Sequence, residues 1–288
     1  MIRACALPVL LAAALALPAQ AQGGGPQAEL EAGIVNAEDL ARLTLKGKTE
    51  GLPDGTRVHV TLWVRGLEVE ASFFMVEVRG NAFAANKVFR NKRFAPLPYE
   101  LKIELLLSAQ RKAIGEFVRR NWGLPQRAKV LMAQKSLEIG TLEEQNEFRT
   151  SSVKELLSLT EKAQATNAIL LKVFNAPLTK DKMERNKQSM SLAQDLQAGF
   201  TQPFDSFLNQ YVALHEPSAI SNLTKSMSLM GRCLSYLRKG KAPKGKATSL
   251  RVRDMLQIVH DELASRLPKP PGQGEEAGDP KPETPKKD

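Results

Sequence analysis

Apolar side chains alternate with polar ones along the first half of the chain, between Arg42 and Gly140. The segments 42–49, 57–65, 72–80 and 97–107 carry an apolar residue at every second position, which is the period of a β-strand with one buried face. His59 and Thr61 are expected on the outward face. A further segment, 129–140, fits either a strand or a helix. The expected inward residues are Leu43, Leu45, Gly47, Val58, Val60, Leu62, Val64, Phe74, Val76, Val78, Leu97, Tyr99, Leu101, Ile103 and Leu105.

The apolar period changes to 3.6 residues after Thr141, which predicts five amphipathic helices packed as a bundle. Ser218 and Ser249 are expected to cap the last two helices. The first two stripes are Leu156, Leu159, Ala163, Leu170 and Val173, then Met183, Met190, Ala193, Leu196 and Phe200. The other three are Phe204, Phe207, Leu208, Tyr211 and Val212, then Ile220, Leu223, Met227, Met230, Leu234 and Leu237, then Val252, Met255, Val259 and Leu263.

These two patterns predict an α+β chain of two domains. An antiparallel β-sandwich is expected over residues 39–141, followed by a C-terminal α-helical bundle over residues 142–267. Turn residues support the first domain: Gly51-Leu52-Pro53-Asp54-Gly55-Thr56, then Gly80 with Phe83, then Leu97-Pro98-Tyr99. On these residues, the segment 43–140 resembles the immunoglobulin-like and prealbumin-like β-sandwiches of secreted bacterial proteins. It has no cysteine pair, and such domains host many functions, so the resemblance implies a fold and no activity.

The ends of the chain differ in composition from its body. Residues 1–21 combine Arg3, an apolar run up to Leu17 and the small residues Ala19 and Ala21, which is the pattern of a secretory signal peptide cleaved after Ala21. Residues 22–38 are expected to be a disordered linker, and residues 268–288 a disordered tail rich in Pro and charge. The protein is therefore expected to be secreted or periplasmic, with no transmembrane span after cleavage.

The charge balance is basic, with a formal net charge of +10 and a pI near 9.6. An exported basic protein does not routinely meet nucleic acid, so acidic proteins and anionic glycans or lipids are the expected partners. Two basic runs are candidate anion-binding sites. One consists of Lys87, Arg90, Lys92 and Arg93 among Phe83, Phe89 and Phe94, and the other of Arg238, Lys239, Lys241, Lys244, Lys246, Arg251 and Arg253.

Both runs also have a purely structural interpretation. In the first, the phenylalanines would point into the sandwich and leave the cations in water. The second contains Gly240, Pro243 and Gly245, which favour a flexible basic loop between two helices. A metal site formed by His215, Glu216, His260 and Asp261 is a weaker alternative for the same region.

Catalytic chemistry has little support in the sequence. Once the signal peptide is removed, Cys233 is the only cysteine, and it lies on the apolar side of its helix, where a thiol acts as a small hydrophobe. No nucleophile, phosphate-loop or dinucleotide motif is present in the sequence. The resulting hypothesis is an exported, non-catalytic envelope protein that serves as an interaction or structural module without a cofactor. Two alternatives remain open: binding to an anionic glycan or lipid surface, and a hydrolase with its site between the domains.

Overall fold

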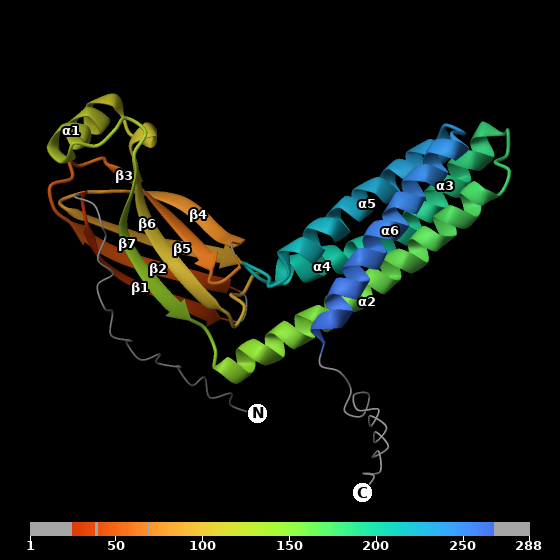
Figure 1. The fold of residues 1–288 in the computed structure, drawn as a ribbon, viewed down its shortest axis with the longest axis horizontal. Coiled ribbons are helices and arrows are strands. Elements are labelled where there is room, and N and C mark those ends of the chain that lie inside the picture. The colour runs from red at the N-terminus through yellow and green to blue at the C-terminus, as the bar shows by residue number, and fades with distance from the viewer. Residues whose placement is uncertain (1–24, 38–39, 68, 268–288) are drawn as a thin grey trace, which may run out of the picture. The chain divides into compact units, whose positions relative to one another are not determined.

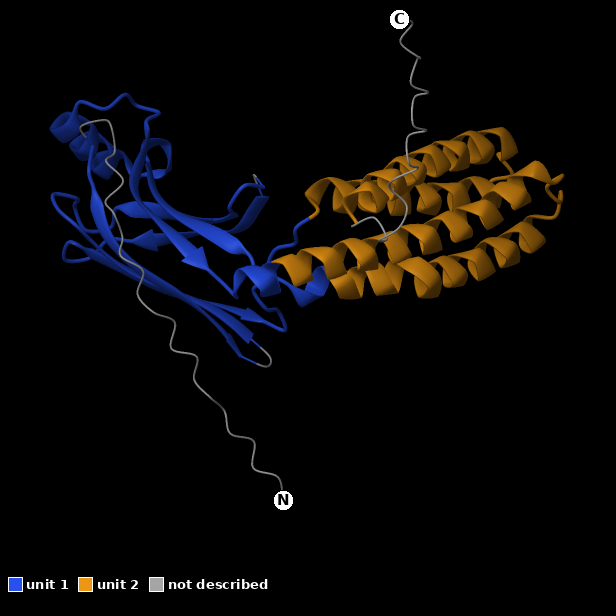
Figure 2. Ribbon diagram, turned by 60° about the horizontal axis from the view of Figure 1, so that its bottom comes forward, with its two compact units in different colours: residues 1–145, 208–215 blue, residues 146–207, 216–288 orange. Residues whose placement is uncertain are grey.

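The computed structural model describes residues 25–37, 40–67 and 69–267. Within these ranges the chain is mixed α+β, with seven antiparallel strands in two sheets followed by five helices (Figure 1). The predicted signal peptide and the predicted C-terminal tail lie outside the described residues. Two compact units share the chain, and the first includes the segment Leu208–His215, which covers the end of one helix and the connection to the next (Figure 2).

The seven strands form two sheets without parallel pairs. The first has the order β1-β2-β5, with β1 (Ala28–Ala37), β2 (Leu40–Thr49) and β5 (Ala82–Arg90). The second has the order β4-β3-β6-β7, with β4 (Val69–Glu77), β3 (Arg57–Val64), β6 (Pro98–Leu106) and β7 (Lys129–Glu138). The segment 129–140, which the sequence left open, is thus mainly strand.

The buried faces of the strands are largely the ones that the alternation predicts. Every predicted inward residue of β3 and β6 is buried, as are Leu43 and Leu45 of β2. The outward face of β3 differs from the prediction, because His59 and Thr61 are only 5% and 4% exposed. Neighbouring strands cover them: the ring of Phe73 on β4 lies 5.2 Å from the His59 ring, centroid to centroid.

The prediction of a disordered linker over residues 22–38 is wrong for the part that is described. Strand β1 occupies Ala28–Ala37 and pairs in antiparallel register with β2 along its whole length, from Ala28 opposite Thr49 to Ala37 opposite Leu40. Its large apolar residues are few, namely Leu30, Ile34 and Val35, and Val35 is exposed. The backbone pairing with a strongly apolar neighbour compensates for the low apolar content of β1 itself.

A helix that the sequence analysis did not predict, α1 (Lys112–Trp122), lies between β6 and β7. The short 3₁₀-helix η1 (Leu107–Ala109) precedes it, and Gly123 ends it in the left-handed conformation with φ of 63°. The Gln110 side chain fixes this insertion. Its amide donates to the carbonyl oxygen of Arg57 at 2.7 Å and accepts from the Arg57 N–H at 2.8 Å, as a paired strand residue would.

The second unit is made of helices that run back and forth along one another (Figure 1). They are α2 (Leu142–Asn175), α3 (Lys182–Leu196), α4 (Gln202–Gln210), α5 (Pro217–Arg238) and α6 (Ala242–Arg266). A π-helical turn, η2 (Gln197–Thr201), joins α3 to α4. Pro203, the second residue of α4, has no N–H to donate, so the wider turn before it accommodates a residue that would break a regular helix.

Three predictions about the helices need correction. Ser218 is not a cap, because α5 begins at Pro217 and its N-cap residue is Glu216. The stripe predicted for α3 is wrong in part, because Met183 and Met190 are 70% and 65% exposed, while Ser189, Leu192 and Leu196 are buried. The predicted loop before Ser249 is also wrong, because α6 begins at Ala242, and Ser249 is a buried mid-helix residue rather than a cap.

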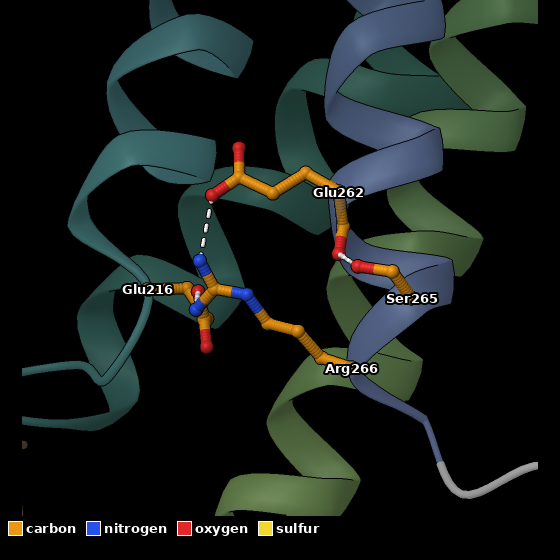
Figure 3. A network of polar contacts seen from close by, with 4 residues as sticks. All are labelled: Glu216, Glu262, Ser265 and Arg266. Atoms are coloured by element: carbon orange, nitrogen blue, oxygen red, sulfur yellow. Dashed lines mark hydrogen bonds and ion pairs between the residues drawn. The ribbon is translucent and has the colours of Figure 1, made fainter.

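Polar contacts tie α6 to its neighbours at two levels. Ser249 donates to the Asn167 side-chain oxygen of α2 at 2.7 Å, and Asn167 donates back to the Ser249 carbonyl at 3.0 Å. Near the end of α6, the Arg266 guanidinium donates to Glu216 at 2.5 Å and to Glu262 at 2.6 Å (Figure 3). Glu216 is 1% exposed and directly precedes α5, so Arg266 joins the end of α6 to the start of α5.

Candidate functional site

One end of the helical unit carries a cluster of cations from two loops and the helix ends beside them, which are distant in the sequence. The loop 176–181 joins α2 to α3 and the loop 239–241 joins α5 to α6, and both lie at the same end of the helices (Figure 1). A β-carbon placed on Gly240 would lie 3.5 Å from the Arg185 guanidinium carbon, and one on Gly245 would lie 2.2 Å from the ring of Phe174. These contacts place the start of α6 beside the end of α2 and the start of α3.

We call this cluster the basic end. Its cations are Lys180, Lys182, Arg185, Arg238, Lys239, Lys241, Lys244 and Lys246. Only two carboxylates, Asp181 and Glu184, occur in the same segments, and Asp181 is engaged as the N-cap of α3, where it accepts the Met183 N–H at 2.8 Å. Within the part of the chain that the structure describes, none of the eight cations forms an ion pair. Their positive charge is therefore directed at solvent.

Arg185 differs from the other cations of the basic end because its side chain stabilises the loop 176–181. Its guanidinium donates to the carbonyl oxygens of Thr179 and Lys180 at 2.7 and 2.8 Å, so it folds the loop 176–181 back onto the start of α3. Carbonyl oxygens are neutral acceptors, and the guanidinium keeps its full charge while making these bonds. Arg185 thus contributes order and positive potential together.

The start of α6 adds to the same potential. Helix N-termini carry partial positive charge and normally attract acidic residues, yet the first turn of α6 holds no acid. Lys241 is the N-cap residue, and Lys244 follows within the first turn. Cations at this position repel the helix dipole, and a bound anion would relieve that repulsion.

Arg251 and Arg253, which the sequence analysis grouped with this run, lie elsewhere. At the helical rise, Arg251 is about 15 Å from Lys241 along α6. Arg253 donates to Asp254 at 2.8 Å, so its charge is partly neutralised. The basic end therefore contains five of the seven residues of the second predicted run.

The first predicted run does not form one surface. Lys87 and Arg90 lie on β5, and the alternation along a strand directs their side chains to opposite faces. The Nζ atom of Lys87 lies 6.0 Å from the centroid of the Phe74 ring, in cation–π range. Lys92 is half-buried. The Arg93 backbone is occupied in pairing, because its N–H donates to the Gln210 carbonyl and its carbonyl accepts from Val212.

The phenylalanines of that run follow its structural interpretation. Phe83 and Phe94 are buried at 3% and 1% exposure, and Phe89 packs edge-on against Phe94 with ring centroids 5.2 Å apart. They are core residues of the first unit and offer no stacking platform for a ligand.

The sequence analysis missed three of the eight cations, namely Lys180, Lys182 and Arg185. They lie some sixty residues before the second run, interspersed with Asp181 and Glu184, so the segment reads as an ordinary solvated helix start. The order of the helices could have shown that these residues lie near the second run. Because α3, η2 and α4 follow one another without a break, the chain runs as four helical segments that alternate in direction. The first and third connections of such segments, here 176–181 and 239–241, lie at the same end, and cations lie in or directly beside both.

The first unit also has a hollow of about 890 Å³ along β1, β2, β4 and β5. Carboxylates of Glu29, Glu31 and Glu77 and cations of Lys46, Lys48 and Arg79 all line it. Charges of both signs alternate around it, so its chemistry favours no single class of ligand.

Histidine and cysteine do not gather into a reactive centre in the described ranges. No group of three or more His, Cys, Asp or Glu side chains there could hold a metal ion. Glu216, one of the residues considered for such a site, binds Arg266 instead, and His260 contacts Asp261 beside it at 3.3 Å. Cys233 is fully buried, and burial raises the pKa of its thiol to about 11.

None of the helices in the described ranges is long and apolar enough to cross a bilayer. Comparisons with family models, with curated proteins and with solved structures found no match for this chain.

Proposed function

We propose that this protein is an exported, non-catalytic interaction module of the cell envelope, and that its helical unit binds an anionic polymer or surface through the basic end. The observation that carries the proposal is the convergence of two helix connections at one end of the helices, with eight cations in them and in the helix ends beside them that form no ion pair among the described residues. Such a surface attracts anions over about 8 Å at physiological ionic strength.

The proposal also covers the export of the protein and the fold of its two units. We propose that residues 1–21 are a signal peptide and that the exported chain begins at Gln22, which mass spectrometry of the exported protein would detect. We further propose that the two sheets form a sandwich of the immunoglobulin-like or prealbumin-like type and that the helices form a bundle. A rigid bundle suits the role because it holds both loops in a fixed arrangement without help from a ligand.

Binding of an anion is favourable because it reduces the repulsion among the cations of the basic end. Eight cations next to a helix N-terminus repel one another, and the repulsion is relieved by a multivalent anion rather than by single ions. Each lysine close to an anionic surface contributes about 1 kcal/mol, so four contacts give a measurable affinity at low salt. The affinity should fall steeply as salt rises, because exposed charges are screened.

The test is elution from immobilised heparin with increasing salt. The variant Lys239→Ser/Lys241→Ser/Lys244→Ser should elute at clearly lower salt than the wild type, because three exposed cations are lost without a change in the core. The matched control Lys87→Ser/Arg90→Ser/Lys92→Ser removes the same charge from β5 and the loop after it, and should shift elution much less. Equal shifts in both triple variants would mean that only net charge matters, and would overturn the proposal.

A further inference from the structure

Apolar groups lie exposed among the cations of the basic end. Met183 is 70% exposed in the first turn of α3, directly after Lys182. Pro177 in the loop 176–181 and Pro243 in the first turn of α6 are exposed as well, and Leu178 is half-buried. A surface that binds only a charged polymer gains nothing from such groups, since they meet water in the free protein and have no apolar counterpart in the ligand.

Apolar groups surrounded by lysines are the pattern of a surface that rests on a lipid bilayer. The apolar side chains enter the boundary between headgroups and acyl chains, while the lysines keep their ammonium groups at the level of the anionic headgroups. Lysine suits this position because its long apolar stem can cross the boundary. Six of the eight cations of the basic end are lysines.

We propose that the basic end docks on an anionic lipid bilayer, with Met183 and the neighbouring loop residues inserted among the headgroups. This inference rests on the proposed function and deepens it by naming the anionic partner as a lipid surface rather than a glycan. The protein would lie on the membrane without spanning it. The attachment would be reversible and sensitive to both salt and lipid charge, because a few apolar groups and lysines bind weakly on their own.

The chain supplies a matched control for the apolar contact. Met190 lies on the same helix and is 65% exposed, close to the value for Met183. It lies seven residues further along, about 10 Å from Met183 at the helical rise and away from the loops. If Met183 inserts into lipid, Met183→Ser should weaken binding and Met190→Ser should not, although both remove the same side chain from the same helix.

The experiment measures cosedimentation of the chain that begins at Gln22 with vesicles of equal parts phosphatidylglycerol and phosphatidylcholine. Pure phosphatidylcholine vesicles and heparin retention are measured in parallel. Met183→Ser is expected to weaken binding to the anionic vesicles about tenfold, from the loss of most of one buried methionine. The same variant should keep wild-type heparin retention. Replacing lysines 239, 241 and 244 by serine should weaken both kinds of binding, by about fivefold for each lysine on the vesicles.

The outcomes separate this inference from the proposed function. If the lysine variant loses heparin retention but Met183→Ser binds vesicles as the wild type does, the basic end binds polyanions and the lipid inference is wrong. Binding to heparin without binding to anionic vesicles would also overturn it, in favour of an anionic glycan. If the lysine variant changes neither kind of binding, the proposed function fails as well.

A fluorescent probe gives a second measurement that does not depend on affinity. Met183→Cys can be labelled with an environment-sensitive dye, and Met190→Cys serves as its control. The native thiol of Cys233 is buried and its pKa is raised to about 11, so it should resist labelling. A blue shift on anionic vesicles is expected for the dye at position 183 and not at position 190. Equal spectra at both positions would overturn the insertion of Met183.

Discussion

Both ring nitrogens of His59 lack a hydrogen-bond partner among the described residues. The side chain is 5% exposed, and both nitrogens are buried without a hydrogen-bond partner. Burial lowers the pKa of His59 from its ordinary value of 6.5, and the charge of Lys129 lowers it further, while Glu104 opposes the shift. The neutral imidazole is therefore the form that the folded protein accepts.

The pH dependence of stability follows from that shift. Between pH 6.5 and the lower pKa of the folded state, the unfolded chain binds a proton that the folded protein does not, so stability is full above pH 6.5 and falls as the pH drops below it. The loss should be smaller in His59→Leu, which cannot take up the proton. Urea unfolding at pH 7.5 and pH 5.0 would measure both losses. The control His260→Gln should lose as much unfolding free energy as the wild type when the pH falls from 7.5 to 5.0. If His59→Leu also loses as much as the wild type, other groups cause the decrease.

At the scale of single residues, the sequence predicted core positions better than exposed ones. Leu101, Ile103 and Leu105 alternate strictly, and each is buried as expected. The methionines of α3 did not follow their pattern, since Met183 and Met190 share one helical face with each other but not with the core. The true core face contains Ser189, whose hydroxyl donates to the Leu234 carbonyl at 3.2 Å. A serine that is buried by such a bond is invisible to a count of apolar residues.

At the scale of elements, Arg266 shows how one exposed side chain can hold two helix ends. It binds the buried carboxylate of Glu216 before α5 and the half-buried carboxylate of Glu262 one turn earlier in α6 (Figure 3). The two bonds contribute differently to the stability of the helical unit. Loss of Arg266 removes a charge-assisted hydrogen bond from a carboxylate that is buried, whereas exposed ion pairs within a helix contribute little.

Arg266→Ala should therefore lower the free energy of unfolding by about 1–3 kcal/mol, which is below the full cost of a deeply buried pair because water reaches the Arg266 site. Glu262→Gln removes only the charge of the second carboxylate, since the amide oxygen can still accept from Arg266, and should cost about 0.5 kcal/mol or less. Helical circular dichroism during urea unfolding would measure both changes. Equal costs in the two variants would contradict the special weight given to Glu216.

The elements that the sequence analysis did not predict depend on contacts outside their own segments. The start of α6 was read as a loop because Gly240, Pro243 and Gly245 lie close together. Proline is favourable in the first turn of a helix, and Gly245 is required by packing, since a β-carbon there would lie 2.2 Å from the Phe174 ring. Strand β1 was missed because the strand that stabilises it, β2, lies outside its own segment. Long-range contacts of this kind are absent from any local pattern.

At the scale of the whole molecule, the basic end depends on both loops being held by their helices. The sequence contained all eight cations, but only the antiparallel course of the helices brings the start of α3 to the start of α6. The run at Lys87 did not become a site because a strand divides its side chains between two faces.

The N-terminal segment provides the last prediction, because β1 lies just after the proposed cleavage point. A chain that begins at Gln22 keeps β1, whereas a chain that begins at Leu40 loses it and leaves β2 as an unpaired edge of the first sheet. Strand β2 is apolar on its buried face and ten residues long, and a bare edge of that kind pairs readily with other chains. The shorter chain should therefore unfold at a lower temperature and aggregate, as measured by thermal denaturation and light scattering. A chain that begins at Gly25 is the control and should behave like the longer one. If the chain beginning at Leu40 were as stable and as monomeric as both, the pairing of β1 with β2 would contribute nothing, and the first unit would begin at β2.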